Sequence, residues 1–147
     1  MNGHVCKVCK YIAIDGSAPE YCPVCGAPKT AFTEDKNAIK LPQDTGSLSE
    51  LEKKHVPVIT VVKKCGLIPD GCMDAHVKLG EVNHPMIDVH YIMHIDFYID
   101  KKFIARAYLT PEKLNAAAAL HLKPGTGRIE TVALCNQHGA WFKESEL

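Results

Sequence analysis

Residues 86–100 carry the clearest alternation of apolar and polar side chains in the sequence. Every second residue there is apolar, and most of the residues between them are polar. Because successive side chains of a strand point to opposite faces, this period of two predicts a β-strand with one face toward a core. The other face, which carries His90, His94 and Asp96, is predicted to point toward solvent or a functional site.

Further strands are predicted from runs rich in β-branched and aromatic residues, over 56–62, 103–109 and 128–135. Residues 111–120 have strong helix propensity. Because sheet context often overrides propensity, we interpret this region as a turn followed by a strand over 117–122. Several short strands within about 100 residues predict a mainly β chain with an antiparallel sandwich.

The uneven distribution of the cysteines divides the chain. Four of the seven lie before residue 26, which predicts a small metal-stabilised domain over residues 1–35. The polar stretch 36–47, which contains proline and glycine, is interpreted as a linker, and the sandwich domain is expected to cover 48–147. The sequence from Ser47 to Glu50 matches a helix capping box, so a short helical turn is expected there.

Charge and composition exclude several classes of protein. The 17 basic and 17 acidic side chains balance, which gives no electrostatic footprint for nucleic acid or an anionic membrane. The first residues lack the apolar core that a signal peptide has, and no apolar run reaches the roughly 18 residues that a spanning helix needs. An odd number of cysteines together with 8 histidines favours metal or redox chemistry over disulfides. We therefore predict a cytoplasmic protein.

Two Cys-x-x-Cys motifs, Cys6–Cys9 and Cys22–Cys25, are separated by twelve residues. Two such motifs together form a tetrahedral cage of four thiolates. A segment of about 35 residues cannot bury enough apolar surface to fold unaided, so the metal must stabilise it. Four sulfur ligands suit either iron or zinc, and the spacing alone leaves a structural zinc ribbon open. A c-type haem is excluded, because no histidine follows either motif.

The wider string from Val5 to Lys29 resembles the short rubredoxin domain at the end of rubrerythrins. This resemblance implies one iron that acts as a one-electron carrier, with zinc as the alternative metal. The implied ligands are Cys6, Cys9, Cys22 and Cys25. Tyr11 and Phe32 are expected to pack over the cluster as its apolar cover.

A second group of donors lies in the rest of the chain. Cys135 and His138 are three residues apart, so a tight turn could bring both onto one metal ion. His55 stands at the start of the predicted strand 56–62, and His84 precedes His90 by six residues. These contexts make His55, His84 and His90 better candidates for metal ligands than the isolated histidines of the chain.

Those strings together resemble the superoxide reductase family, which includes desulfoferrodoxins and neelaredoxins. The resemblance covers nearly the whole second domain and implies an immunoglobulin-like β-sandwich. It also implies an iron with four equatorial imidazoles, one axial thiolate and an open sixth position. The implied ligands are His55, His84, His90, His138 and, in the axial position, Cys135.

The activity implied by the resemblance is the one-electron reduction of superoxide to hydrogen peroxide. Ferrous iron would give the electron, and the rubredoxin-like centre would relay electrons from a rubredoxin or a reductase. Assembly as a homodimer or homotetramer is also implied. Neither a nucleic acid nor a membrane is expected as a partner.

The family carries a Glu-Lys pair directly before its first histidine ligand. Lys54 matches the lysine, which is expected to attract superoxide and to help order a proton-donating water. Lys53 stands in place of the glutamate, and the nearest acid is Glu52. Glu52 is therefore only a provisional candidate for a carboxylate that reaches the iron.

Three alternatives share parts of this residue pattern. A blue-copper site needs a methionine after its last ligand, but all four methionines precede Cys135. A di-iron peroxidase needs two Glu-x-x-His pairs on a four-helix bundle, whereas the second domain is predicted to be β. A non-enzymatic iron electron carrier or redox sensor stays open as the alternative function.

The remaining cysteines and histidines are given simpler interpretations. Cys65 and Cys72 lie at the two ends of a predicted loop and are interpreted as free thiols, with a reversible disulfide as the alternative. His94 and His121 are interpreted as surface residues.

Overall fold

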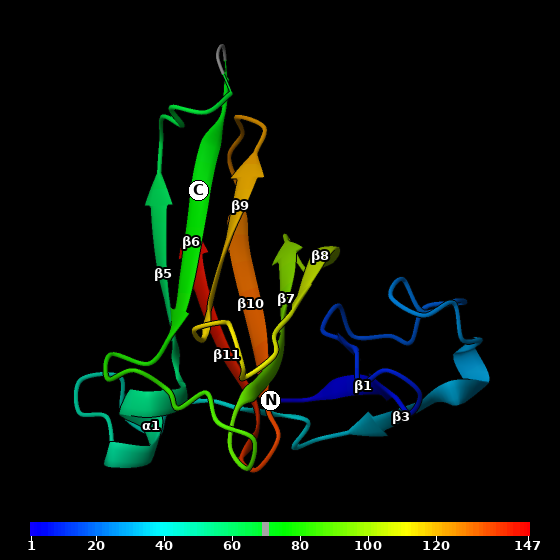
Figure 1. Ribbon diagram of the computed structural model, residues 1–147. Coiled ribbons are helices and arrows are strands. Elements are labelled where there is room, and N and C mark those ends of the chain that lie inside the picture. Colours follow the sequence, from blue (N-terminus) through cyan, green and yellow to red (C-terminus); the bar gives the residue numbers. More distant parts are fainter. Residues whose placement is uncertain (69–70) are drawn as a thin grey trace.

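The computed structural model describes residues 1–68 and 71–147, and within them the fold is mainly β, as predicted. A small N-terminal sheet has the strand order β2-β1-β3, and Figure 1 shows it beside the larger C-terminal part. Its elements are β1 (Gly3–Cys6), β2 (Ile12–Ala13), the short 3₁₀ helix η1 (Lys29–Ala31) and β3 (Phe32–Asp35).

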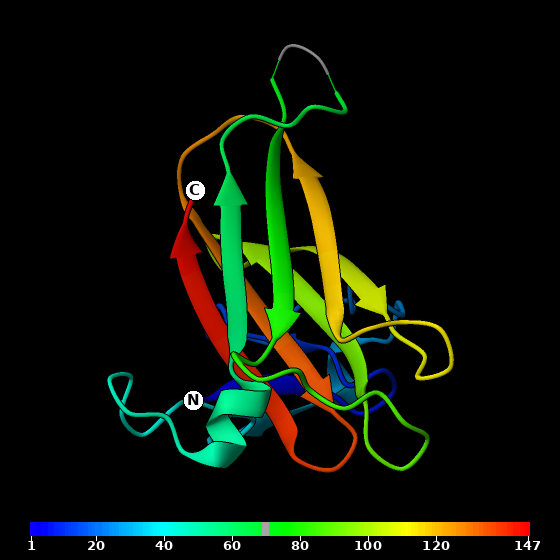
Figure 2. The same ribbon diagram turned by 60° about the vertical axis from the view of Figure 1, so that its left-hand side comes forward.

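Two sheets form the C-terminal sandwich, and Figure 2 shows the smaller sheet in front of the larger one. The larger sheet has the order β4-β11-β10-β7-β8, and its strands are β4 (Ile39–Lys40), β7 (Ile92–Ile99), β8 (Lys102–Tyr108), β10 (Arg128–Cys135) and β11 (Gly139–Glu146). The smaller sheet consists of β5 (Pro57–Val62), β6 (Met73–Leu79) and β9 (Ala117–Leu122). The helix α1 (Glu50–His55) directly precedes β5.

Most of the predicted strands are confirmed. β9 and β10 begin and end where the sequence predicts them, and β5 and β8 differ from the prediction by one residue at their ends. The alanine-rich strand β9 pairs antiparallel with β6 along its whole length. Its backbone groups therefore find partners in the sheet, which overrides the helix propensity of the sequence.

The core of the sandwich lies between its two sheets. Alternate residues of β6, such as Val77 and Leu79, face Ile95 and Phe97 of β7 in one buried cluster, and each of the four is at most 1% exposed. Burial of each such side chain contributes roughly 1.5–3 kcal/mol relative to an exposed position. This core holds the strand ends in place, and the candidate ligands lie at those ends.

The predicted strand over 86–100 begins too early. β7 starts only at Ile92, and the residues before it form a turn in which the backbones of Ile87 and His90 exchange hydrogen bonds of 2.9 and 3.2 Å. Ile87 and Val89 are 55% and 68% exposed. The apolar alternation in the first part of this stretch therefore does not mark a buried face, and His90 lies on a loop.

The polar face of β7 is buried, whereas the sequence predicted that it points toward solvent or a functional site. His94 is only 3% exposed, which makes its interpretation as a surface residue wrong, and Asp96 and Tyr98 are fully buried. The N-terminal part of the chain covers this face. The Tyr98 hydroxyl donates a hydrogen bond of 2.7 Å to the carbonyl of Ile12, and its ring stacks on that of Tyr11.

A buried ion pair ties the two parts of the chain together. The Arg106 guanidinium donates two hydrogen bonds, of 2.5 and 2.7 Å, to the Asp96 carboxylate. Its third nitrogen donates to the backbone carbonyl of Cys9 at 2.8 Å. The two side chains are 3% and 1% exposed, so both charges depend on each other for compensation.

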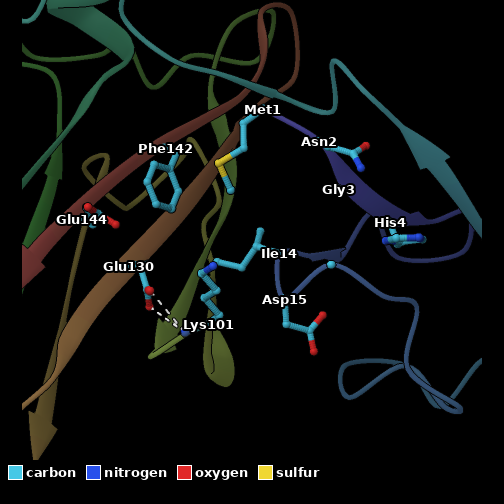
Figure 3. A pocket seen from close by; sticks show the side chains of 11 residues that line it. Met1, Asn2, Gly3, His4, Ile14, Asp15, Lys101, Glu130, Phe142 and Glu144 are labelled. Carbon is cyan, nitrogen blue, oxygen red and sulfur yellow. Dashed lines mark hydrogen bonds between the residues drawn. The ribbon is translucent and has the colours of Figure 1, made fainter.

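The contact between the two parts continues to the chain's first residues. Figure 3 shows Met1 and Ile14 opposite Lys101 and Glu130, which belong to the sandwich. Both carboxylate oxygens of the buried Glu130 accept hydrogen bonds from the backbone N–H of Lys101, and burial raises the pKa of Glu130. The N-terminal ammonium donates to the carbonyl of Ile39 at 2.6 Å.

The segment predicted as a linker contributes a strand. β4 pairs in parallel with β11, and Ile39 is 1% exposed. The residues from 36 to 47 therefore extend the larger sheet as well as connecting two regions. Within the described residues, no helix is both long and apolar enough to span a membrane.

We expect Asp96→Ala to lower the free energy of unfolding by about 3–5 kcal/mol, because it leaves a buried guanidinium without its partner. Urea denaturation of the metal-loaded protein measures this change. Glu144→Ala is the matched control, since it breaks an ion pair with Arg128 whose side chains are 44% and 52% exposed. The control should change stability by no more than about 0.5 kcal/mol. Equal effects of the two substitutions would show that the pair does not hold the parts together.

Candidate metal centres

The first candidate centre, called the four-cysteine centre here, brings together the side chains of Cys6, Cys9, Cys22 and Cys25. The sulfur atoms of Cys6 and Cys25 are 3.7 Å apart, and those of Cys9 and Cys22 are 3.5 Å apart. Metal–sulfur bonds of about 2.3 Å in a tetrahedron place the sulfurs about 3.8 Å apart. The spacing therefore fits one tetrahedral metal ion.

Each Cys-x-x-Cys motif closes with the same backbone turn. The backbone N–H of Lys10 donates a hydrogen bond of 2.9 Å to the backbone carbonyl of Cys6. The backbone N–H of Gly26 donates one of 2.8 Å to the carbonyl of Cys22. Both donors have positive φ angles, 64° and 74°, a conformation that costs glycine little. A hydrogen bond from the backbone N–H of Ala27 lowers the pKa of Cys25, which favours the thiolate that binds metals.

Aromatic rings lie beside the four-cysteine centre, as the sequence predicts. Tyr11 and Phe32 meet edge to face, with ring centroids 6.2 Å apart. Tyr11 is 5% exposed and also packs against Tyr98 and Phe103 of the sandwich. The apolar surroundings of this centre are thus shared between the two parts of the chain.

The second candidate centre, called the histidine–cysteine centre here, lies at one end of the sandwich. Figure 2 shows α1, the loop before β7 and the β10–β11 turn gathered at this end. α1 ends at His55, β10 ends at Cys135, and the turn after β10 carries His138. His84 and His90 come from the loop before β7.

The nitrogen atoms of these rings point toward one another. The Nε2 atoms of His55 and His84 are 3.1 Å apart, and so are His90 Nε2 and His138 Nδ1. Cys135 Sγ lies 3.7 Å from the same nitrogen of His138. Metal–nitrogen bonds of about 2.1 Å at right angles place neighbouring nitrogens about 3.0 Å apart. The donor atoms of His55, His90, Cys135 and His138 all lie within 4.8 Å of one another, and His84 joins this group through its contact with His55.

Burial favours the neutral form, which binds metals, in three of these imidazoles. It lowers the pKa of His84 to about 4 and also lowers that of His55, which is 1% exposed. For His90, burial acts together with the charges of His138 and Lys54 to lower the pKa. A neutral ring offers a lone pair to a metal, so the cluster suits a cation.

Backbone carbonyls orient two of the rings. His55 Nδ1 lies 2.7 Å from the carbonyl oxygen of Leu51, and His84 Nδ1 lies 2.7 Å from that of Pro85. Because a carbonyl only accepts hydrogen bonds, Nδ1 must carry the proton in both rings. That tautomer leaves Nε2 available to the metal, as is common for histidine ligands.

Two amide side chains hold the loop that carries His90. Asn136 accepts from the backbone N–H of Tyr91 at 2.9 Å and donates to the carbonyl of Val89 at 3.2 Å. Gln137 donates to the same carbonyl at 2.5 Å. Sequence reasoning missed both as positioning residues. The one feature of the sequence that could have identified them is their position between the candidate ligands Cys135 and His138.

Trp141 packs directly against a candidate ligand. Its ring centroid is 5.2 Å from that of His55, and the Lys40 ammonium lies 5.5 Å from the centroid of its indole ring. The indole is 3% exposed. It therefore walls one side of the histidine–cysteine centre from solvent.

The helix that ends at His55 begins with a capping box, two residues later than predicted. Ser49 is the N-cap and accepts from the backbone N–H of Glu52, instead of Ser47 pairing with Glu50. The two carboxylate oxygens of Glu52 accept from the backbone N–H groups of Gln43 and Ser49, at 2.8 and 2.7 Å. The Ser49 side chain and these two backbone hydrogen bonds lower the pKa of Glu52, and they hold its carboxylate at the start of the helix.

The two lysines before His55 differ in their contacts. The Lys53 ammonium is held 2.8 Å from the Glu50 carboxylate. Lys54 is exposed, and its charge contributes, after burial and His138, to the lowered pKa of His90. The charge of Lys40 likewise contributes to the lowered pKa of His55, so two lysines act on the candidate ligands.

A family comparison identifies the larger part of the chain. Residues 47–144 match the family model described as desulfoferrodoxin. The chain belongs to the desulfoferrodoxin family. Residues 4–33 match a second model, the rubredoxin-like domain of rubrerythrin, so a rubredoxin-like domain precedes the desulfoferrodoxin part.

Individual relatives agree with this membership. The chain is 30% identical to a desulfoferrodoxin of Syntrophotalea carbinolica over 142 residues, which cover 95% of this chain and 92% of the relative. It is 27% identical to a putative superoxide reductase of Methanocaldococcus jannaschii, over 67% of this chain and 86% of that protein. The solved superoxide reductase of Nanoarchaeum equitans matches with 27% identity and a TM-score of 0.56, over 74% of this chain and 99% of the other.

We expect Glu52→Ala to lower Tm by about 2–4 °C, because the capping box is lost. At every pH, the absorption spectrum of the oxidised variant should be the same as that of the oxidised wild-type protein. Thermal denaturation and a spectroscopic pH titration measure the two effects. Glu50→Ala is the matched control, since its carboxylate contacts only the exposed Lys53. An alkaline spectral shift that disappears in Glu52→Ala would show that this carboxylate reaches the metal.

Proposed function

We propose that the chain reduces superoxide to hydrogen peroxide at an iron held by the histidine–cysteine centre. The observation that carries this function is the convergence of four imidazoles and one thiolate in a domain of the desulfoferrodoxin family. Relatives named as superoxide reductases support the substrate. The proposed ligands are His55, His84, His90, Cys135 and His138.

Iron at this centre would supply the single electron that superoxide accepts on its way to peroxide. The chain's own residues prepare the site for that reaction. Carbonyls of Leu51 and Pro85 hold two rings in one tautomer, and Trp141 excludes water from one side. The Cys135 thiolate adds negative charge beside the four neutral rings and distinguishes the donor set from histidine alone.

Lys54 is proposed to act on the substrate. Superoxide is an anion, so a cationic side chain beside the centre raises its local concentration and its rate of encounter. The ammonium also orders water, which can deliver the two protons that peroxide requires. Lys53 is a poorer candidate for this role, because Glu50 neutralises its charge at 2.8 Å.

The four-cysteine centre is proposed to hold a second iron and to pass electrons to the histidine–cysteine centre. Support comes from the match to a rubredoxin-like domain and from the Arg106 contact that fixes Cys9 on the sandwich. The electron donor would be a rubredoxin or a reductase. The relay would run within one chain or across a homodimer or homotetramer assembled through the sandwich.

A superoxide pulse applied to the reduced protein tests the proposed activity. We expect hydrogen peroxide to form with no oxygen released beyond uncatalysed dismutation, and the second-order rate to fall about tenfold in Lys54→Ala. Lys53→Ala is the matched control and should change the rate much less. A pulse that yields no peroxide and leaves the reduced centre unchanged would favour a non-enzymatic carrier or sensor.

Substitution of one ligand in the four-cysteine centre tests the relay. Cys9→Ser should leave peroxide formation from the pre-reduced protein intact and slow re-reduction of the oxidised histidine–cysteine centre by at least about tenfold, since one electron entry point is damaged. Stopped-flow absorption with a reduced rubredoxin measures both steps. Re-reduction at the wild-type rate would assign the four-cysteine centre a structural role.

A further inference from the structure

A third cluster of metal-ligating side chains lies at the opposite end of the sandwich. His55 precedes the first residue of β5, whereas Cys65 follows its last residue, so the two clusters occupy opposite ends of that strand. Figure 2 shows α1 at one end of β5 and the connection to β6 at the other. The cluster, called the third cluster here, consists of Cys65, Cys72, Asp74 and His121.

The donor atoms of the third cluster all lie within 4.8 Å of one another. His121 Nδ1 is 3.3 Å from Cys65 Sγ and 3.6 Å from Cys72 Sγ. Cys72 Sγ is 3.7 Å from Asp74 Oδ1. Tetrahedral bonds of about 2.3 Å to sulfur and 2.1 Å to nitrogen or oxygen separate such pairs by about 3.6 Å. These three separations lie within about 0.3 Å of the value that one tetrahedral ion requires.

One separation is shorter than this geometry requires. His121 Nδ1 and Asp74 Oδ1 are 2.7 Å apart, which is a hydrogen-bond distance. Shared coordination would lengthen this contact to about 3.4 Å. The His121 ring is 40% exposed, and the Asp74 side chain is 16% exposed, so a rotation of the ring accommodates the change.

The sheet places most of the cluster without help from an ion. Asp74 of β6 and His121 of β9 are directly paired in the antiparallel register. Cys72 immediately precedes β6, and its carbonyl accepts a hydrogen bond of 2.9 Å from the amide of Cys65. The amide of Leu67 lies 3.3 Å from the Cys65 sulfur, as amides do in metal-binding cysteine turns. The cluster is therefore largely preorganised.

We propose that the third cluster binds one Zn(II) ion through four side chains, namely Cys65, Cys72, Asp74 and His121. Two thiolates, one imidazole and one carboxylate form a donor set that zinc takes in tetrahedral sites. Binding releases the two thiol protons to solvent and changes no oxidation state. All four coordination positions are filled by the chain, which is the pattern of a structural site.

The proposed ion would join three strands at this end of the smaller sheet. It links Cys65, beyond β5, with β6 and β9, whereas the sheet hydrogen bonds alone leave Cys65 attached through one backbone contact to Cys72. The site stands apart from the two candidate redox centres. It therefore adds to the proposed function and does not depend on it.

Zinc analysis of the full-length, iron-loaded protein tests this inference. The reduced protein is incubated anaerobically with ZnCl₂ and desalted, and iron and zinc are then measured together by mass spectrometry. We expect one zinc per chain with the iron content unchanged. Cys72→Ser and His121→Ala should each lose most of that zinc. His76→Ala is the matched control, because its ring is 3.8 Å from Asp74 but lies outside the cluster.

A second measurement guards against variants that fold poorly. Zinc should protect Cys65 of the wild-type protein from alkylation by iodoacetamide at least about tenfold, because a thiolate bound to zinc is a weaker nucleophile. Zinc retained equally by wild type, Cys72→Ser and His121→Ala would overturn the inference. Absence of zinc, or a disulfide between Cys65 and Cys72 in the anaerobic protein, would also overturn it. Superoxide reduction should continue in all these cases, which separates this test from that of the proposed function.

Discussion

The tight turn between β10 and β11 is the constraint on which the histidine–cysteine centre depends. Cys135 pairs with Gly139 at the end of the hairpin, and Gly139 has a φ angle of 76°, which a residue with a side chain rarely adopts. This turn brings Cys135 and His138 to the same side. Asn136, between them, then holds the neighbouring loop. One hairpin end thus supplies two donors and positions a third.

The same sheet that supports this centre also carries the rubredoxin-like domain. One face of β7 belongs to the core of the sandwich, and the other is covered by the N-terminal part through Tyr98 and the Asp96–Arg106 pair. A buried pair of this kind contributes little net stability over an apolar contact, but removal of one partner is costly. It therefore favours one docking geometry, and a reproducible geometry between the two candidate metal centres is what the proposed electron relay needs.

Sequence reasoning predicted what depends on local spacing and missed what depends on distant pairing. Motif spacing and family resemblance both point to the four cysteines, whereas the complete five-ligand set follows from the resemblance and stays a prediction. The burial of Tyr98 on the polar face of β7 was not predictable from alternation, because the covering residue Ile12 is 86 positions away in the sequence. The third cluster depends on the register between β6 and β9, which brings Asp74 beside His121. The capping box was predicted two residues too early because the sequence contains two overlapping matches, Ser47–Glu50 and Ser49–Glu52. Only the packing of the helix determines which of them forms.

Metal analysis combined with the absorption spectrum of the oxidised protein tests the central claim most directly, namely that Cys135 and four imidazoles bind one iron. The account predicts two irons per chain. It also predicts a thiolate-to-iron absorption band that disappears in Cys135→Ser, while the bands of the four-cysteine centre persist. Zinc alone in both centres, or a band that survives in Cys135→Ser, would contradict it.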